Sequence, residues 1–214
     1  MKEFHKIDNS EVFNFDCVEG MKSYPNNYFD LAIVDPPYGI KRDGKRKSTS
    51  KRGGHKGYKF KGWDNEVPKP EYFKELFRVS KNQIIWGANY FPNYLSSSSG
   101  WILWDKGQRI DQADGELAFS SFDRALRVFT LNRVAIKMEG AIHPTQKPVK
   151  LYDWIYKNYA TEGMKVIDTH LGSQSNRISA EKNKIIFTAF ETDVDYYNEG
   201  NKRFENFKKQ LTIF

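Results

Sequence analysis

The sequence predicts an α/β protein in which helices cover both faces of a mostly parallel, doubly wound sheet. Two observations predict this fold. Short apolar runs recur along the 214-residue chain, and they are continuous rather than alternating. Continuous runs are typical of strands that are buried on both faces, as in parallel sheets. Segments with the apolar spacing of amphipathic helices lie between the runs, and this alternation is typical of doubly wound sheets.

Four apolar runs predict strands, and each of them ends at an acidic residue. The runs are 31–34 before Asp35, 101–104 before Asp105, 166–167 before Asp168 and 185–190 before Glu191. In doubly wound sheets, ligands bind beyond the carboxyl ends of the strands. We therefore expect three of the four acids to face one cleft.

Three further segments predict helices that pack on the sheet. Their apolar residues recur at helical spacing: Tyr72, Phe73, Leu76 and Phe77; Leu151, Trp154, Ile155 and Tyr159; and Tyr197, Phe204, Phe207 and Leu211. A fourth helix is expected over 176–182, directly after a loop of small residues. We interpret the aromatic stripes of these helices as core packing rather than as cofactor contacts.

The composition excludes several classes of protein. The chain has 34 Lys+Arg against 27 Asp+Glu, a net charge of +7 and one cysteine, Cys17. One cysteine excludes an intrachain disulfide framework and a multi-cysteine zinc site, and we expect no metal. The chain is too apolar for disorder, and no apolar run approaches the roughly 18 residues of a membrane span. Without a signal-peptide pattern at residue 1, we expect a cytoplasmic protein with one domain over 1–214.

The segment 41–61 concentrates positive charge. It holds ten Lys and Arg residues, one acid and four glycines, with almost no apolar residues. Such a segment cannot pack into a core, so we interpret it as a mobile loop that is either merely solvated or a clamp on phosphates. The candidate phosphate ligands are Lys41, Arg42, Lys45, Arg46, Lys47, Lys51 and Arg52.

The tetrapeptide Asp35-Pro36-Pro37-Tyr38, directly after a predicted strand, carries the most specific chemical signal. Two prolines hold the chain extended, so that their carbonyl groups can point into a pocket. The acid can accept a hydrogen bond from an amine, and the tyrosine ring offers a face for stacking. Together these residues predict a slot for a flat heterocycle that bears an exocyclic amino group.

A second signal is the small-residue loop 169–175, which follows a predicted strand and precedes a helix. Such a loop lets a ligand approach the backbone and the helix N-terminus. Glu191 comes nineteen residues after Gly172 and ends the next strand, where an acid can bind ribose hydroxyls. Because the loop holds one glycine, it does not meet a dinucleotide fingerprint. The pattern indicates a cofactor that contains adenosine without identifying it.

These motifs resemble those of the β-class, or permuted, amino-group DNA methyltransferases, which use S-adenosylmethionine. In that family D-P-P-Y precedes the cofactor loop, as Asp35 to Tyr38 precede Gly172 here. The segment 143–148 reads HPTQKP and resembles the family's H-P-T-Q-K-P, while Asp16-Cys17 resembles a G-D-C segment that contacts the cofactor adenine. The segments 101–106 and 115–118 resemble the family's middle strands. The resemblance therefore covers nearly the whole chain.

The resemblance implies a Rossmann-like methyltransferase fold and methyl transfer from S-adenosylmethionine to the N6 amine of adenine. Double-stranded DNA is the expected partner, with base flipping, and a homodimer and a restriction–modification setting remain options. Target recognition would lie within about 90–142. Asp35, Pro36, Pro37 and Tyr38 would be catalytic. The implied cofactor-binding residues are Asp16, Cys17, Asp35, Lys147, Asp168, His170, Leu171, Gly172, Ser173, Gln174, Ser175, Glu191 and Thr192.

The sequence departs from the family pattern in the cofactor loop, and alternatives stay open. His170 and Gln174 stand where the family usually has phenylalanine and a second glycine, and Asn14-Phe15 replaces the glycine before Asp16. The alternatives are methylation of cytosine N4 in DNA, methylation of adenine in RNA, a non-catalytic DNA-binding relic and a nucleotide-dependent oxidoreductase. Cys17 lacks the Pro-Cys context of cytosine-C5 enzymes, so we do not expect it to be a nucleophile.

Overall fold

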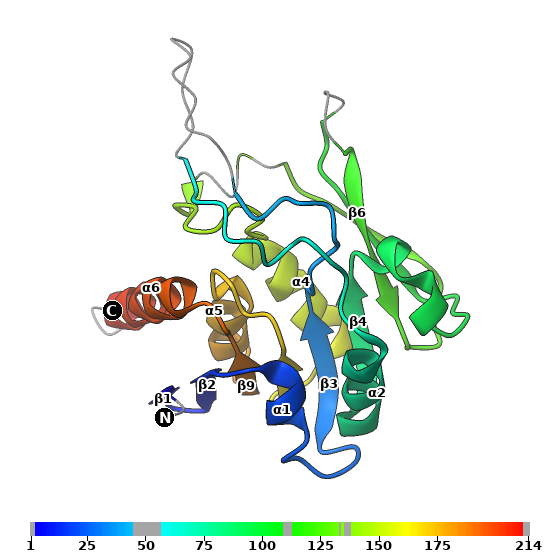
Figure 1. The fold of residues 1–214 in the computed structure, drawn as a ribbon, viewed down its shortest axis with the longest axis horizontal. Coiled ribbons are helices and arrows are strands. Elements are labelled where there is room, and N and C mark those ends of the chain that lie inside the picture. Colours follow the sequence, from blue (N-terminus) through cyan, green and yellow to red (C-terminus); the bar gives the residue numbers. More distant parts are fainter. Residues whose placement is uncertain (1–2, 45–56, 109–112, 133, 135–137, 212–214) are drawn as a thin grey trace.

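The computed structural model of the chain describes residues 3–44, 57–108, 113–132, 134 and 138–211. A nine-stranded sheet runs through these residues in the order β1-β2-β9-β8-β3-β4-β6-β5-β7 (Figure 1). The strands are β1 Glu3–Ile7, β2 Ser10–Asn14, β3 Phe29–Val34, β4 Ser80–Trp86, β5 Trp101–Asp105, β6 Gly115–Ser120, β7 Arg127–Thr130, β8 Lys165–Asp168 and β9 Ile186–Phe190.

Most of the sheet is parallel. β2, β9, β8, β3 and β4 run in one direction, and β5 and β7 run in that direction too, because β6 is antiparallel to both β4 and β5. β1 forms an antiparallel hairpin with β2 at one edge. The carboxyl ends of all strands except β1 and β6 therefore point to the same edge of the sheet, where doubly wound folds bind their ligands.

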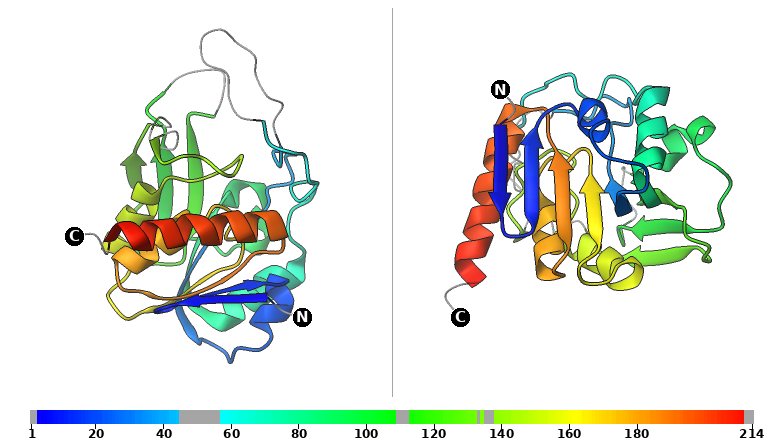
Figure 2. Two further views of the ribbon diagram at one scale, coloured as in Figure 1. Left: turned by 90° about the vertical axis from the view of Figure 1, so that its left-hand side faces the viewer. Right: turned by 90° about the horizontal axis from the view of Figure 1, so that it is seen from below.

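Helices cover both faces of the sheet, as the sequence predicts. The helices are α1 Cys17–Met21, α2 Pro70–Val79, α4 Val149–Tyr159, α5 Ser175–Lys182 and α6 Val194–Leu211, with short 3-10 turns η1 Ala88–Tyr90 and η2 Pro92–Tyr94. α1 and α2 pack on one face, and α4, α5 and α6 pack on the other. Figure 2 shows α6 running alongside the β1–β2 hairpin at one edge of the sheet.

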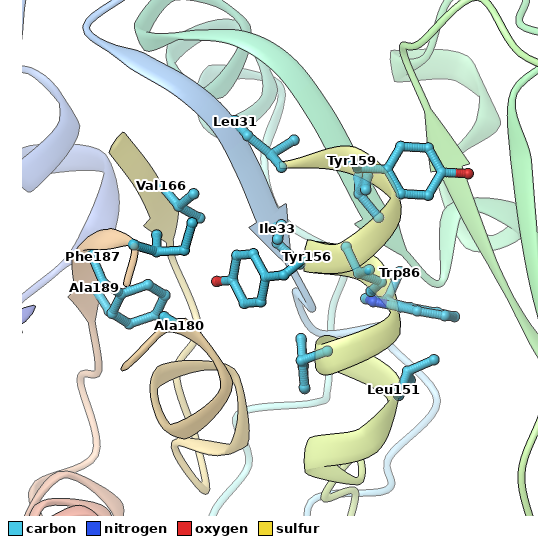
Figure 3. Packing of buried hydrophobic residues seen from close by; sticks show 14 of the residues in the cluster. Leu31, Ile33, Trp86, Leu151, Tyr156, Tyr159, Val166, Ala180, Phe187 and Ala189 are labelled. Carbon is cyan, nitrogen blue, oxygen red and sulfur yellow. The ribbon is translucent and has the colours of Figure 1, made fainter. Parts of the chain in front are cut away.

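The strands supply alternate residues to the two cores. In β3, Leu31 and Ile33 point toward α4, whereas Ala32 and Val34 point toward α2. This is why the strands read as continuous apolar runs rather than alternating ones. Figure 3 shows the core on the α4 side, where Tyr156 lies among residues of β3, β8 and β9, and Trp86 of β4 lies on the side of Leu151. These buried layers hold the strand ends, and the loops that follow them, in fixed positions.

The predicted elements agree with the structure, and the sequence reading missed several others. The strands expected at 31–34, 101–104, 166–167 and 185–190 correspond to β3, β5, β8 and β9, and all the expected helices are present. The β1–β2 hairpin was missed because its residues alternate with polar ones. β4 was missed because only its last residues are apolar, and β7 is short and exposed. No helix among the described residues has the length and apolar character that crossing a membrane needs.

Candidate active site

The segment after β3 is tied to the base of the basic segment by two buried carboxylates. Asp64 accepts hydrogen bonds from the backbone N–H groups of Tyr38, Gly39 and Arg42, at 2.7 to 2.9 Å. Asp43 accepts from the N–H groups of Lys61 and Gly62. Because these carboxylates satisfy five backbone donors, the chain on both sides of the basic segment is held against the strand end. Residues 45–56 lie outside the described residues.

Asp35 follows the last residue of β3, and both of its carboxylate oxygens have partners. The Tyr38 hydroxyl donates a hydrogen bond of 2.5 Å to Asp35 Oδ1. Lys147 Nζ lies 2.5 Å from Asp35 Oδ2 and also donates to the Tyr38 oxygen, at 3.2 Å. Burial raises the pKa of Asp35, and the nearby Lys147 ammonium opposes this effect. Asp35, Tyr38 and Lys147 therefore form one closed hydrogen-bonded group.

Two further charges extend this group away from the strand end. Glu116, on β6, lies 3.1 Å from Lys147 Nζ through Oε2 and 2.5 Å from Lys106 Nζ through Oε1. Burial opposes the charge of Glu116, but the two ammonium groups outweigh it and lower its pKa to about 2. Burial likewise opposes the charge of Lys147, yet Asp35 and Glu116 raise its pKa. The two carboxylates and two ammonium groups thus compensate one another in a buried setting.

The Tyr38 ring packs against the end of β4. It stacks on Tyr90 of η1 with a centroid distance of 5.0 Å and an interplanar angle of 14°. A Cβ atom at Gly87 would lie 2.0 Å from the Tyr38 ring, so the position requires glycine for this close approach. Tyr38 therefore turns its ring toward η1 and its hydroxyl toward Asp35. It does not line the cavity described next.

A cavity of about 230 Å³ lies beyond the carboxyl ends of β2, β3, β8 and β9. Asp35 and Pro37 line one end, and Asp16, Cys17 and Glu191 line another part of its wall. The loop after β8 contributes Thr169, His170, Leu171, Gly172, Ser173 and Ser175. The cavity therefore joins the D-P-P-Y segment to the small-residue loop, which are 130 residues apart in the sequence.

Glu191 holds the loop after β8 through its carboxylate. Its two oxygens accept hydrogen bonds from the N–H groups of Gly172, at 2.7 Å, and Asp193, at 2.9 Å. Gly172 has φ of +51°, a conformation that favours glycine. Burial raises the pKa of Glu191 to about 7, because backbone N–H groups only partly offset the desolvation. A carboxylate in this position can accept further hydrogen bonds from hydroxyl groups in the cavity.

Gln174 stands where the resembling family has a glycine, and its side chain points away from the cavity. Gln174 has φ of +62°. Its amide nitrogen donates to Asn201 Oδ1 at 2.8 Å, and its amide oxygen accepts from Arg177 at 3.0 Å. Gly200 of α6 makes this arrangement fit, since a Cβ there would lie 2.5 Å from Gln174 Cγ. The extra bulk is therefore accommodated beneath α6.

Other sequence-predicted residues take different positions from those expected. Asp168 does not line the cavity; it lies beneath it, accepting from the His170 N–H at 3.1 Å and from Asn176 at 2.8 Å. Thus two, not three, of the strand-end acids line the cavity, and Asp105 instead accepts from the Gly107 N–H. Lys147 lines the cavity but pairs with Asp35.

The remaining predicted residues are placed as follows. Thr192 lines the cavity, whereas Pro36 is buried outside its lining. Lys41 and Arg42 are exposed beside the D-P-P-Y segment. Lys45, Arg46, Lys47, Lys51 and Arg52 lie outside the described residues. Burial raises the pKa of Cys17 to about 12, so this thiol is not activated as a nucleophile.

Several residues of the site were missed by sequence reasoning. Trp63, His143 and Tyr196 line the cavity and contact one another: His143 stacks on Trp63 at 5.2 Å and meets the Tyr196 ring edge at 4.3 Å. Burial lowers the pKa of His143 to about 3, so the imidazole is neutral. Glu116, the partner of Lys147, and Lys106, the second partner of Glu116, were also missed. Their one signal was charge within otherwise apolar segments.

Comparison with known proteins identifies the fold. No family model matches the sequence. The type II methyltransferase M.HinfI of Haemophilus influenzae is 29% identical over 49% of this chain, which spans 33% of the length of that relative. Among solved structures, the M1.HpyAVI–SAM complex has a TM-score of 0.62 at 17% identity, covering 91% of this chain and 99% of the other. The cytosine-N4-specific PvuII DNA methyltransferase has a TM-score of 0.62 at 14% identity, covering 97% and 94%.

The structural likeness extends over almost the whole of both neighbours, whereas the sequence likeness to M.HinfI is confined to about half of this chain. The order of motifs, the nine-stranded sheet and the cavity at the strand ends are consistent with one another. The chain has the Rossmann-like methyltransferase fold.

Proposed function

We propose that the protein transfers a methyl group from S-adenosylmethionine to the exocyclic N6 amine of adenine in double-stranded DNA. The observation that carries this proposal is the cavity that joins Asp35 to Glu191 and Gly172. An amine-accepting carboxylate and a ribose-accepting carboxylate at two parts of one cavity are what such a transfer needs. The similarity to M.HinfI and to the M1.HpyAVI–SAM complex supports it.

The residues present fit this cofactor. Glu191 can accept the two ribose hydroxyls while it keeps its backbone N–H donors. Asp16 and Cys17 lie on the cavity wall next to Glu191's strand and would contact the adenine ring. Ser173, Ser175 and Thr145 supply hydroxyl groups along the same cavity for the polar end of the methionine part. When bound, the cofactor supplies an electrophilic methyl group on a sulfonium.

Asp35 and the Pro36 carbonyl would activate the target. The lone pair of an aromatic amine is delocalised into the ring, which makes the amine a poor nucleophile. Two acceptors for its N–H groups would localise the lone pair and stabilise the positive charge that forms on nitrogen. Holding the amine in line with the methyl group supplies much of the remaining acceleration.

DNA would present the adenine by base flipping, at a cost of a few kcal/mol. Tyr38 would have to leave its stacking contact with Tyr90 before its ring could stack on the flipped base. The basic segment 41–61 would contact phosphates. The exposed Lys41 and Arg42 lie next to Tyr38 in the chain, which supports this arrangement. Phosphate contacts position the DNA without reading its sequence. Side chains of the small loops within 90–142 would recognise the target sequence, in a protein with one domain over 1–214.

A second candidate function is methylation of cytosine N4. The structural similarity to the cytosine-N4-specific PvuII enzyme supports it, and it needs the same carboxylate and the same cavity. The acid at position 35 favours adenine in the resembling family, in which cytosine-N4 enzymes more often carry serine there. The two candidates differ in product alone.

The test is transfer of tritium from labelled S-adenosylmethionine to unmethylated duplex DNA, followed by nucleoside analysis. We expect N6-methyladenine as the labelled nucleoside. N4-methylcytosine would establish the second candidate. The DNA supplied should contain all short sequences. If none of it becomes labelled while the cofactor still binds in calorimetry, the proposed reaction is overturned and a non-catalytic DNA-binding protein is favoured.

A further inference from the structure

The Tyr38 hydroxyl occupies a paired donor and acceptor position next to the cavity. It donates to Asp35 Oδ1 at 2.5 Å and accepts from Lys147 Nζ at 3.2 Å. One atom therefore satisfies an acceptor on the carboxylate and a donor on the ammonium at once. If the side chain of Tyr38 turned away, Asp35 Oδ1 and Lys147 Nζ would each lose one hydrogen-bond partner at the same place, while their ion pair with each other remained.

The position of Lys147 fixes the direction of the N–H group that it donates to Tyr38. An ammonium has three N–H donors. Two of them point to carboxylates, at 2.5 Å from Asp35 Oδ2 and 3.1 Å from Glu116 Oε2. Glu116 is itself fixed, because its second oxygen pairs with Lys106 at 2.5 Å. The side chain of Lys147 is 3% exposed. The third donor, now given to Tyr38, is therefore preset in direction.

The acceptor Asp35 Oδ1 and the donor Lys147 Nζ, which Tyr38 now occupies, match the edge of a base that carries an exocyclic amine. Adenine presents an N6 amine beside the acceptor N1, and cytosine presents an N4 amine beside the acceptor N3. We infer that Lys147 donates a hydrogen bond to this ring nitrogen while Asp35 accepts from the neighbouring amine, with the Tyr38 hydroxyl holding the place until the base enters. This inference rests on the proposed function and adds a residue that reads the substrate.

The arrangement selects a class of base. Guanine and thymine present a carbonyl oxygen beside a ring N–H, so their oxygen would face the Asp35 carboxylate and their N–H would face the Lys147 ammonium. Both contacts are mismatched, and mismatched buried polar groups are strongly unfavourable. Because two carboxylates share the ammonium, it orients the ring while leaving little net positive charge to withdraw electrons from the amine. Lys147 thus distinguishes aminated bases from oxo bases.

The DNA product of a wild-type reaction is first sequenced to locate the base that the enzyme methylates. Two duplexes carry adenine or 1-deazaadenine at that position, each opposite an abasic site, so that loss of the pairing N1 does not change the cost of flipping. The compound 1-deazaadenine keeps the amine but has carbon in place of N1. If the modified base is cytosine, 3-deazacytosine takes its place. The measured quantity is kcat/KM for tritium transfer.

We expect wild type to use the deaza duplex roughly 10- to 100-fold less well, the effect of losing a charge-assisted hydrogen bond. Lys147→Met should be slow on both duplexes and lose this discrimination. Glu116→Gln is the matched control, because it contacts the same ammonium but not the base: its rates should fall on both duplexes while the ratio is retained. The intrinsic reactivity of the deaza amine is the same for every variant and cancels in the comparison.

Equal kcat/KM of wild type on the two duplexes would overturn the inference while leaving the methyltransferase function intact. Discrimination retained in Lys147→Met would overturn it as well. If Lys147→Met does not fold, Lys147→Ala takes its place, since it removes the same ammonium and must lose the same discrimination. A wild type that methylates no DNA overturns the proposed function instead, and the inference with it.

Discussion

Two carboxylates in one cavity are stabilised in opposite ways. Asp35 is compensated by a buried ammonium and belongs to a chain of four charges that includes Glu116 and Lys106. Glu191 has no ammonium within ion-pair distance among the described residues, and backbone N–H groups are the donors that hold it. Full charges fix a group in place, whereas backbone dipoles leave its protonation open to change. The first suits a group that must orient an amine, and the second suits a group that exchanges partners with hydroxyls.

The strongest test of this contrast removes the charge at one end. Asp35→Asn should lower kcat by at least roughly 100-fold, since electrostatic stabilisation of a developing charge is worth about 10²–10³. Cofactor affinity, measured by calorimetry, should stay within a few-fold, because the role proposed for Asp35 is to contact the target amine rather than the cofactor. Asp105→Asn is the matched control, as Asp105 also ends a strand of the sheet, β5, but does not line the cavity. A variant that retained a tenth of wild-type turnover would contradict the role given to Asp35.

The pH dependence of cofactor binding tests the other end. With its pKa raised to about 7 by burial, Glu191 gains a proton as the pH falls through neutrality. The ionised form is the better acceptor for two hydroxyls, so affinity for S-adenosylmethionine should be about tenfold lower at pH 6 than at pH 8. Glu191→Gln should bind more weakly and lose most of this dependence. A wild-type affinity that is constant over this range would show that Glu191 does not hold the ribose.

For folding, the sign of the Glu191 effect is the reverse. The pKa of Glu191 in the folded protein lies above its usual value of 4.5. Its contribution to stability is therefore fully present below about pH 4.5 and is lost as the pH rises through about 7. The difference in free energy of unfolding between wild type and Glu191→Gln should change over this window and level off above it.

The smallest expected effect concerns the packing that supports the Glu191 side of the cavity. Gly200→Ala should lower the free energy of unfolding by about 1–3 kcal/mol through overpacking, because the new Cβ would lie 2.5 Å from Gln174 Cγ. Adding Gln174→Gly should recover much of this loss, since the glycine removes both the bulk and the strained φ. Urea denaturation of the two single variants and the double variant measures the coupling. Simple additivity would show that the two positions do not constrain each other.

The sequence was sufficient for the parts of the site that are local in the chain. Asp35 and Glu191 were found because each follows a recognisable apolar run, and Gly172 because small residues separate a strand from a helix. The pairing of Glu116 with Lys147 and with Lys106 could not be found in this way. Their contacts depend on β6 lying antiparallel between β4 and β5, and on a loop more than 30 residues later in the chain. Local apolar periodicity predicts neither the order of strands nor such long-range pairing.

The direction in which side chains point could not be predicted from the sequence either. Gln174 was expected to add bulk in the cofactor site, but glycine in the next helix lets it turn beneath α6. Tyr38 was expected to present its ring to a ligand, yet the ring stacks on Tyr90. In both cases a glycine distant in the sequence, Gly200 or Gly87, decides the rotamer. Composition reveals that glycines are present, but only the fold shows which side chains they admit.

Asp43 and Asp64, the two aspartates at the base of the basic segment, allow the length of this segment to change. Asp43 and Asp64 fix the chain at 38–43 and 61–64 through backbone hydrogen bonds, independently of the residues between. The entropy of closing such a loop grows only with the logarithm of its length, so doubling it costs about 0.6 kcal/mol. Insertions between Asp43 and Lys61 should therefore leave Asp35 and Tyr38 in place. This makes the segment a natural point at which to insert new cationic residues without changing the site at the strand ends.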